Sequence, residues 1–453
     1  MITGGTVVTA SGPVTADVLI SGGRIAGVVA PGLVSGDGAP TIDAAGKLVL
    51  PGMVDVHVHT REPGYTHKED ISSATAQAAA GGVTTIFGMP NLNPPTTTLE
   101  TLEQVFDLYR AKSIVDWNHN PAATDPAEVA KMTKTGICAF KIYMVVDTGR
   151  TYPHPAGTGM HDNGHLLRMM DVISGSGKRL IIHPHDQALM DYIEGAFLAR
   201  GENTPQGYAR AYAARNGVIW DTAIDVVVRL AEAASCPVHI AHMQTPHSID
   251  TVRRAKARGV DVTCEVNHWA LFLSTWDDVE RLGPYALSYW VPDAARAAIW
   301  EGLRDGTIDI ISSDHAPHTR EEKEVGWTKM WSSHTGTPGI QYYYPLLLDA
   351  VGKGQLSLER AVDAAATRPA RDFGLQASKG QIAIGYDADI VIADMNAPWT
   401  ITNDGVLSRI GWTCYNGRTL NVQFETTLVR GEPVFADGEV VGKPGYGKIA
   451  TAR

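Results

Sequence analysis

Histidines, a lysine and an aspartate stand at the ends of apolar runs, and residues of these types can bind metal ions. His57 and His59 close the run MVDVHVH, in which residues i and i+2 of a strand point to the same face. Two imidazoles on one face suit a divalent metal ion. For an isolated His-x-His, two hydrogen-bonded structural histidines are an equally good interpretation.

Lys141 lies within the apolar run ICAFKIYMVV. Burial lowers the pKa of a lysine, so that more of the side chain is the neutral amine. A neutral amine can react with carbon dioxide to give a carbamate, whose two oxygens can bridge two cations. The alternative is a lysine whose ammonium group extends from the strand end to water.

Three further runs end in residues of the same kind. His183 and His185 lie at i and i+2 in RLIIHPHDQ, so their spacing does not choose between them. His239 and His242 lie at i and i+3 in VHIAHMQT, so at most one of them faces the site. Asp314 ends IDIISSD, where a single aspartate commonly caps the next helix. Five separate runs thus end in a residue that can bind metal, and structural roles explain this joint pattern poorly.

The segments that must position these residues alternate between strand and helix patterns. The apolar runs typical of buried strands are 53–59, 83–89, 138–146, 179–185, 237–243, 260–266 and 308–314. Helical patterns lie between them, for example at 221–234 and 248–259. Six or more such alternations predict a parallel sheet, and at this length we expect an α/β fold closed as a (β/α)8 TIM-like barrel. The active site of such a barrel lies at the C-terminal ends of the strands.

Both ends of the chain carry a different pattern. Short alternating runs, separated by Gly, Pro and Asp, occur within the first fifty residues and return after residue 379. This alternating pattern is typical of antiparallel strands joined by turns. We therefore predict that residues 1–50 and 381–453 form one small β-sandwich and that residues 51–380 form the catalytic barrel.

The net charge and the cysteine content indicate which partners and which cellular location to expect. The net charge of −11 argues against nucleic acid or an anionic membrane as a partner. The 4 cysteines include no Cys-x-x-Cys pair, which excludes a disulfide scaffold and a cysteine zinc knuckle and favours a reducing, cytoplasmic location. The first residues lack the pattern of a signal peptide, and no apolar run approaches the roughly 18 residues needed to cross a bilayer.

The motifs together resemble a known family. PGMVDVHVHTREPGYTHKED, FKIYM, IIHPHD, HIAHMQT, SSDHAPHT and KGQIAIGYDADIVIAD resemble the cyclic amidohydrolases, the dihydroorotase, hydantoinase and allantoinase branch of the amidohydrolase superfamily. The resemblance covers nearly the whole chain. It implies that a small cyclic amide is hydrolysed at a C–N bond by a homo-oligomer, either a dimer or a tetramer. It also implies two divalent metal ions, with zinc expected first and manganese, cobalt or iron as alternatives.

The resemblance assigns a role to each metal-competent residue. One metal is expected on His57, His59 and Asp314, and the other on His183 and His242. Lys141, as the carbamate, is expected to bridge them. Asp314 is also expected to move the proton from the attacking water to the leaving nitrogen.

The substrate depends on other positions. Dihydroorotases hold the substrate carboxylate with an Arg in HxHxRxPG, an Asn in MPN and a His after the metal-binding Asp, and here these positions carry Arg61, Asn91 and His318. Three donors at one spot suit an anionic ring substituent. The alternative is that Arg61 pairs with Glu62 or Glu69 and that Asn91 shapes a turn.

Two stretches depart from the dihydroorotase pattern. TxExTPHH is replaced by TCEVNHWALF, which contains Trp269, and PPLR is replaced by LSYWVPD, which contains Tyr289 and Trp290. We expect these three aromatic residues to form part of a cover over the substrate ring. DDVERLGPY and GYGKIATAR are closer to hydantoinases, so ring opening of the hydantoinase, dihydropyrimidinase or allantoinase type is the alternative. A metal-free, non-catalytic scaffold is a remote alternative, because every expected ligand is present.

Overall fold

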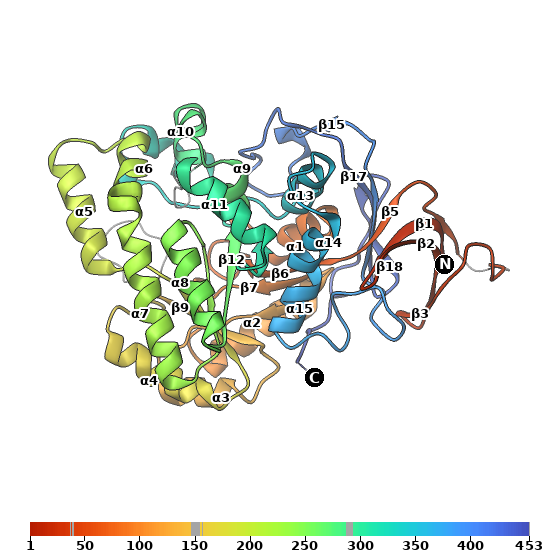
Figure 1. Ribbon diagram of the computed structural model, residues 1–453, viewed down its shortest axis with the longest axis horizontal. Helices are drawn as coiled ribbons and strands as arrows, with labels where there is room; N and C mark the ends of the chain where they lie inside the picture. The colour runs from red at the N-terminus through yellow and green to blue at the C-terminus, as the bar shows by residue number, and fades with distance from the viewer. Residues whose placement is uncertain (37, 39, 146–154, 156, 287–292, 453) are drawn as a thin grey trace.

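Eight parallel strands form the centre of the protein. The computed structural model describes residues 1–453 except 37, 39, 146–154, 156, 287–292 and 453. The strands are β6 (Met53–Val58), β7 (Val83–Gly88), β8 (Asp116–His119), β9 (Ala139–Tyr143), β10 (Arg179–His183), β11 (Val238–Ile240), β12 (Val262–Asn267) and β13 (Ile310–Ser312). They form one three-stranded and one five-stranded sheet, which the bridges Val58–His315 and Ala122–Lys141 join at both seams. The predicted barrel is thereby confirmed (Figure 1).

Helices surround the barrel, and α4 to α8 gather on the side away from the N-terminal strands (Figure 1). Asp or Thr side chains fix where many of them begin. Thr245, for example, accepts a hydrogen bond from the Ser248 amide at the start of α8. The helices are α1 (Ile71–Ala80), α2 (Leu99–Lys112), α3 (Pro126–Met132), α4 (Asn163–Ser174), α5 (Gln187–Ala199), α6 (Pro205–Ala213), α7 (Val218–Ala234), α8 (Pro246–Ala257), α9 (His268–Phe272), α10 (Trp276–Leu282), α11 (Asp293–Arg304), α12 (Arg320–Glu324), α13 (Tyr343–Gly352), α14 (Leu358–Val362) and α15 (Arg368–Asp372).

The sequence analysis did not predict strand β8. Its residues, DWNH, are mostly polar, yet all of them are buried. Asn118 donates to the carbonyl oxygens of Gly136 and Ala450, and His119 lies 3.0 Å from the Thr96 hydroxyl. Contacts far apart in the chain therefore satisfy the polar side chains of β8, and hydrophobic periodicity does not show such contacts.

The alternation along each strand decides which side chains face the barrel interior. On β9, Ala139 belongs to the internal apolar cluster, whereas Phe140 and Ile142 pack in the layer between strands and helices. Lys141 lies two residues after Ala139 and therefore points inward. Ile181 of β10 belongs to the same internal cluster, so His183 points inward in the same way.

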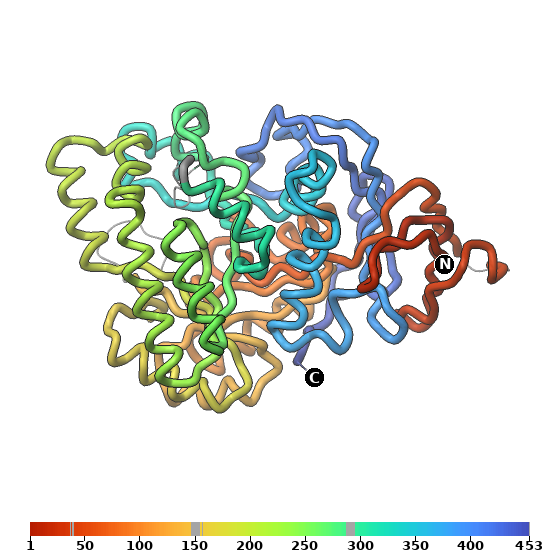
Figure 2. Tube along the Cα trace, in the orientation of Figure 1, coloured from red at the N-terminus to blue at the C-terminus, as the bar shows by residue number. Residues whose placement is uncertain are grey.

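Strands from the N-terminal and C-terminal parts of the chain form one further sheet of nine strands, in which β5 and β14 pair with each other (Figure 2). This confirms the small β-domain built from both ends. The chain passes from β5 to β6 between Pro51 and Met53, and the exact division at residues 50 and 380 stays a prediction. The sheet contains β1 (Ile2–Thr9), β2 (Gly12–Ser21), β3 (Arg24–Val29), β4 (Ile42–Asp43), β5 (Leu48–Pro51), β14 (Ile390–Asp394), β17 (Gln423–Val429), β18 (Glu432–Ala436) and β19 (Glu439–Val440); β15 (Trp399–Thr400) pairs separately with β16 (Thr419–Leu420).

A buried charge cluster ties this sheet to the barrel. Lys379 Nζ lies 2.5 Å from Asp116 of β8, 2.6 Å from Asp389 and 3.1 Å from Asp387. The lysine side chain is 3% exposed, and Arg430 also pairs with Asp116. Lys379 thus compensates three carboxylates that are close together.

We expect Lys379→Met to lower the free energy of unfolding by about 3–5 kcal/mol, because it leaves buried carboxylates uncompensated. The matched control is Lys131→Met, which removes an exposed pair with Glu128 and should cost below about 1 kcal/mol. Urea denaturation of both variants measures the difference. Equal losses would show that the cluster contributes no more than a surface ion pair.

Candidate metal centre

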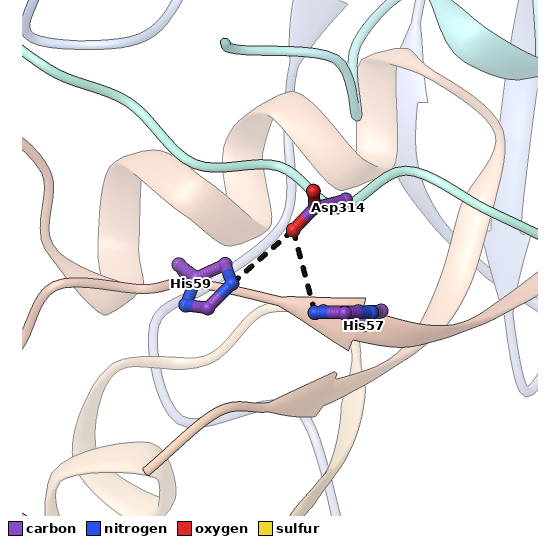
Figure 3. Close-up of side chains that lie close together, drawn as sticks. All are labelled: His57, His59 and Asp314. Atoms are coloured by element: carbon purple, nitrogen blue, oxygen red, sulfur yellow. Dashed lines mark ion pairs between the residues drawn. The ribbon is translucent and has the colours of Figure 1, made fainter. Parts of the chain in front are cut away.

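His57, His59 and Asp314 meet at the C-terminal end of the barrel (Figure 3). The Nε2 atoms of His57 and His59 lie 3.3 and 3.2 Å from Oδ1 of Asp314. The pairing of β6 with β7 shifts register between Asp55 and Val58, the segment that carries His57. Such β-bulges re-aim side chains next to active sites. The register shift thus lies at the position of His57, whereas His59 and Asp314 follow the ends of β6 and β13.

Two members of this group, His59 and Asp314, have the charge states that metal ligands require. Burial lowers the pKa of His59 to about 3, so its imidazole is neutral at pH 7. For Asp314, burial acts to raise the pKa, but the neighbouring His57 and His242 outweigh it and hold the pKa below its usual range. A neutral imidazole and an ionised carboxylate result.

His183 and His242 form a second group beside the first. Nε2 of His242 lies 3.1 Å from Nδ1 of His183, and Nδ1 of His242 lies 3.7 Å from Oδ2 of Asp314. His242 follows the end of β11 with a left-handed backbone, at φ 62°. His185 Nδ1 lies 3.3 Å from His183 on the side away from His242. The sequence spacing left two choices open, between His183 and His185 and between His239 and His242. In the structure, His183 and His242 contact each other.

His239 has different surroundings. Its Nδ1 lies 2.8 Å from the Thr263 hydroxyl, and its Nε2 lies 3.2 Å from Glu265. These contacts place His239 against β12, as expected if only one of His239 and His242 faces the histidine group.

Lys141 is fully buried, and its Nζ has no hydrogen-bond partner among the residues that the structure describes. Burial lowers its pKa to about 8, although Glu265 and Asp314 act in the opposite direction. At pH 7 about one side chain in ten is then the neutral amine, compared with about one in three thousand at an ordinary pKa. An unpartnered amine close to carboxylates and imidazoles suits conversion to a carbamate that binds metal.

Each of three histidines has an oxygen beside its Nδ1, which fixes the orientation of the ring. His57 Nδ1 lies 2.6 Å from Glu265, His59 Nδ1 lies 2.6 Å from Asn91, and His242 Nδ1 lies 2.7 Å from Asn267. The Nε2 atoms are therefore the ones left to bind metal, as in metalloenzymes whose ligands are held by outer partners.

The sequence analysis missed two of these oxygens. Glu265 and Asn267 both belong to β12, in the run TCEVN, and both are fully buried. The sequence could have indicated them by their spacing of i and i+2 on one strand, because this spacing places two polar side chains on the same face.

Arg61 and His318 also lie together. Nη2 of Arg61 lies 3.1 Å from Nε2 of His318, and Arg61 Nε donates to the Pro317 carbonyl. Lys68 Nζ lies 3.2 Å from the other ring nitrogen of His318 and 2.7 Å from Glu322. The Asn91 oxygen lies 2.6 Å from Nδ1 of His59, and the action of Asn91 together with Arg61 and His318 on a substrate stays a prediction.

The alternative pairing of Arg61 is wrong. Glu62 pairs with Lys112, and Glu69 accepts a hydrogen bond from Gln77. Among the described residues, no carboxylate lies within 4.0 Å of the Arg61 guanidinium, although Arg61 is only 3% exposed. Burial lowers the pKa of Arg61 to about 10, which still leaves it charged at pH 7.

Of the three aromatic residues predicted to cover the substrate ring, the structure describes only Trp269. Trp269 lies on α9, is 2% exposed, and has its ring centroid 6.0 Å from that of His242. Trp269 is also part of the hydrophobic core, so its place in a cover over the substrate ring stays a prediction beside the alternative of ordinary core packing. Tyr289 and Trp290 lie outside the described residues.

We expect Glu265→Gln to lower the affinity for divalent metal roughly 10- to 100-fold, because the amide holds the His57 ring less firmly than the carboxylate does. Glu194→Gln is the matched control, since Glu194 is equally buried but contacts Tyr212. Metal content after dialysis against graded chelator measures the affinity. Equal retention of metal in both variants would contradict the orienting role of Glu265.

The comparisons with known proteins agree with this geometry. The profile of the amidohydrolase family matches residues 48–434. An L-hydantoinase of Paenarthrobacter aurescens is 30% identical over 99% of this chain and 96% of its own. A dihydroorotase of Halobacterium salinarum is 36% identical over 89% of this chain and 90% of its own.

Solved structures of hydantoinases are also similar to this chain. The L-hydantoinase from Arthrobacter aurescens superposes with a TM-score of 0.94 at 29% identity, over 99% of both chains. A D-hydantoinase superposes with a TM-score of 0.90 at 29% identity, over 100% of this chain and 98% of its own. Among the described residues, no helix combines the length and apolar character needed to cross a membrane. The protein belongs to the amidohydrolase family, as one of its cyclic amidohydrolases.

Proposed function

We propose that the protein opens a cyclic amide or ureide ring that carries an anionic substituent, by hydrolysis of a C–N bond with two divalent metal ions. The observation that carries the choice of substrate is Arg61, a buried guanidinium with no carboxylate within 4.0 Å among the described residues. A buried charge of this kind is strongly disfavoured unless an opposite charge compensates it. An anionic group on the substrate supplies that charge.

The side chains of the centre fit the metal ions. Ligand atoms of His57, His59 and Asp314 all lie within 4.8 Å of one another, and Lys141 presents an unpartnered amine. We assign one ion to these three residues, the second to His183 and His242, and the bridge to a carbamate on Lys141. We expect zinc first, with manganese, cobalt or iron as alternatives, since imidazole and carboxylate oxygens accept all of them. Such ions lower the pKa of a water molecule toward neutrality and polarise a carbonyl group.

The protein's own groups then carry out the proton transfers. Asp314 is ionised and takes a proton from the attacking water. It returns this proton to the ring nitrogen as the C–N bond breaks, so that the nitrogen leaves as a neutral group. Glu265, Asn91 and Asn267 hold the histidines in place during these steps.

Arg61 and His318 bind the anionic substituent. Each charge-assisted hydrogen bond to it contributes about 1.5–3 kcal/mol. Lys68 adds a second cation on the other side of the His318 ring. A neutral ring brings no opposite charge to the Arg61 guanidinium, which Glu322 and Asp314 stabilise only from beyond 4.0 Å.

Ring opening of an uncharged hydantoin or dihydropyrimidine is the second candidate. The observation that favours it is the TM-score of 0.94 with an L-hydantoinase over 99% of both chains. A hydrolysis screen over dihydroorotate, dihydrouracil, allantoin, hydantoins and cyclic imides decides between the two candidates. The anionic-ring proposal requires the highest kcat/KM for an acidic ring.

We expect Lys141→Ala to remain folded and to lose nearly all activity, because the bridging oxygens are lost. Short carboxylic acids added with the metal should restore part of the turnover by supplying oxygens in the same place. Turnover is measured with and without propionate. Full activity of the variant without any acid would exclude the carbamate.

We expect Arg61→Ala to lower kcat/KM for an acidic ring roughly 100-fold, about 2.7 kcal/mol, and to change kcat/KM for unsubstituted hydantoin far less. Arg110→Ala, at an exposed position of α2, is the control and should change neither value. The clamp is disproved if Arg61→Ala weakens both substrates equally, which would make Arg61 a structural residue.

A further inference from the structure

The His318 ring lies between two cationic side chains, one at each of its nitrogens. Nε2 lies 3.1 Å from Nη2 of Arg61, and Nδ1 lies 3.2 Å from Nζ of Lys68. Burial and the charges of Arg61 and Lys68 hold the pKa of His318 well below its usual range, so the ring is neutral at pH 7. A neutral imidazole has one N–H group and one acceptor nitrogen, whereas guanidinium and ammonium groups only donate. The ring can therefore accept a hydrogen bond from only one of the two cations.

The surroundings of Lys68 favour it as the donor that the ring accepts. Its Nζ lies 2.7 Å from Oε1 of Glu322, an ion pair that stabilises the ammonium form. Glu322 is itself fixed at the start of α12, where its Oε2 accepts from the Thr319 amide at 3.0 Å. Nδ1 of His318 lies 3.5 Å from this same Oε2, too far for a strong hydrogen bond. Lys68 is thus the closer partner of Nδ1.

An anion beside Arg61 completes this arrangement. If Nδ1 of His318 accepts from Lys68, the ring proton is on Nε2, where it faces the Arg61 guanidinium. Two donors 3.1 Å apart can both donate to one oxygen of an anion. The form of the ring with its proton on Nε2 is therefore the one that suits an anionic substituent.

We propose that Lys68 is a positioning residue, whose ammonium group donates to Nδ1 of His318 and thereby keeps the ring proton on Nε2 for donation to the anionic substituent. Lys68 acts through the ring and does not itself touch the substrate. Glu322 holds the ammonium group in place for this role. The inference rests on the proposed function, because it assigns a further residue to the recognition of an anionic ring.

The charged groups around Lys68 decide the pH range over which it can donate. Burial and the charge of Arg61 lower the pKa of Lys68 to about 8, while Glu322 acts in the opposite direction. The other titratable groups close to it are Tyr65, Lys323, whose pKa burial lowers to about 7, and His334, whose pKa burial lowers to about 4. Above pH 8 Lys68 is mainly a neutral amine, which can accept a hydrogen bond from Nδ1–H. The ring proton then moves from Nε2 to Nδ1, and the donor to the anion is lost.

The test compares dihydroorotate with dihydrouracil, which share one ring and differ in the carboxylate. The ratio of their kcat/KM values, measured from about pH 6 to about pH 9.5, cancels the titration of groups that act on both rings. We expect this ratio to fall in the wild-type enzyme as the pH rises through about 8. Lys68→Met should lower the ratio at pH 7 roughly 10- to 100-fold, since a charge-assisted hydrogen bond to the anion is lost, and should abolish the fall near pH 8.

Glu322→Gln provides a second variant, which keeps an oxygen for the Thr319 amide. It removes the carboxylate that raises the pKa of Lys68, so the fall in the ratio should move to lower pH. Glu321→Gln, at the exposed neighbouring position, is the matched control and should leave the profile unchanged.

Nitrogen-15 NMR of histidine-labelled enzyme gives a readout that does not depend on turnover. With orotate bound, we expect the His318 proton on Nε2 in the wild type and on Nδ1 in Lys68→Met, the His318 signals being those absent from His318→Asn. The same protonated nitrogen in both proteins would overturn the positioning role, because Lys68 would then contribute its charge alone.

The kinetic outcomes separate this inference from the proposed function. A ratio that Lys68→Met leaves unchanged, or equal losses for both rings, would overturn the role of Lys68 while the preference for an acidic ring stands. A wild-type enzyme that prefers dihydrouracil at every pH would overturn the proposed function, and this inference with it.

Discussion

Lys141 brings an amine into the interior of the barrel, where the described residues offer it no hydrogen bond. A charged ammonium group in that position is disfavoured, which is why its pKa falls to about 8. The His59 and His242 imidazoles have the same constraint, because burial lowers their pKa to about 3 and about 4 and so keeps these rings neutral at pH 7. Glu265, Asn91 and Asn267 then fix which nitrogen of each ring faces the centre. Neutral nitrogens and one ionised carboxylate, all in a low dielectric, form a site that a divalent cation stabilises.

The backbone contributes to this arrangement at the points where strands end. Arg61, His242 and Asp314 all adopt left-handed backbone conformations, with φ of 61°, 62° and 45°. Such conformations cost of order 1–3 kcal/mol each and persist where the surrounding structure determines them. Here the closed barrel does so, since each residue follows a hydrogen-bonded strand. The strain turns each side chain toward the mouth of the barrel, which the strand direction alone does not achieve.

The sequence predicted the parts of the fold that depend on periodicity. Seven barrel strands are recognisable as apolar runs, and both terminal groups of strands by their alternating pattern. The inward direction of Lys141 follows from its strand. Strand β8 was missed, because distant partners such as Ala450 satisfy its polar residues. The position of Asn91 on His59 was also missed, since a motif gives residue types but no side-chain direction. Glu265 carried a signal in its spacing from Asn267, but its partner His57 is 208 residues away in the chain.

Reaction class and substrate choice come from different parts of this barrel. The proposed metal ligands project from or directly follow strands β6, β9, β10, β11 and β13, whose positions the closed sheet fixes. The residues that we propose for substrate choice, Arg61 and His318, lie on the longer βα segments, which can change without moving a strand. This separation explains why the chain is similarly related to an L-hydantoinase and to a dihydroorotase, at 30% and 36% identity. In the proposal, a buried guanidinium with no carboxylate within 4.0 Å among the described residues indicates the charge of the substrate more directly than overall similarity does, because burying a charge is costly unless an opposite charge lies close to it.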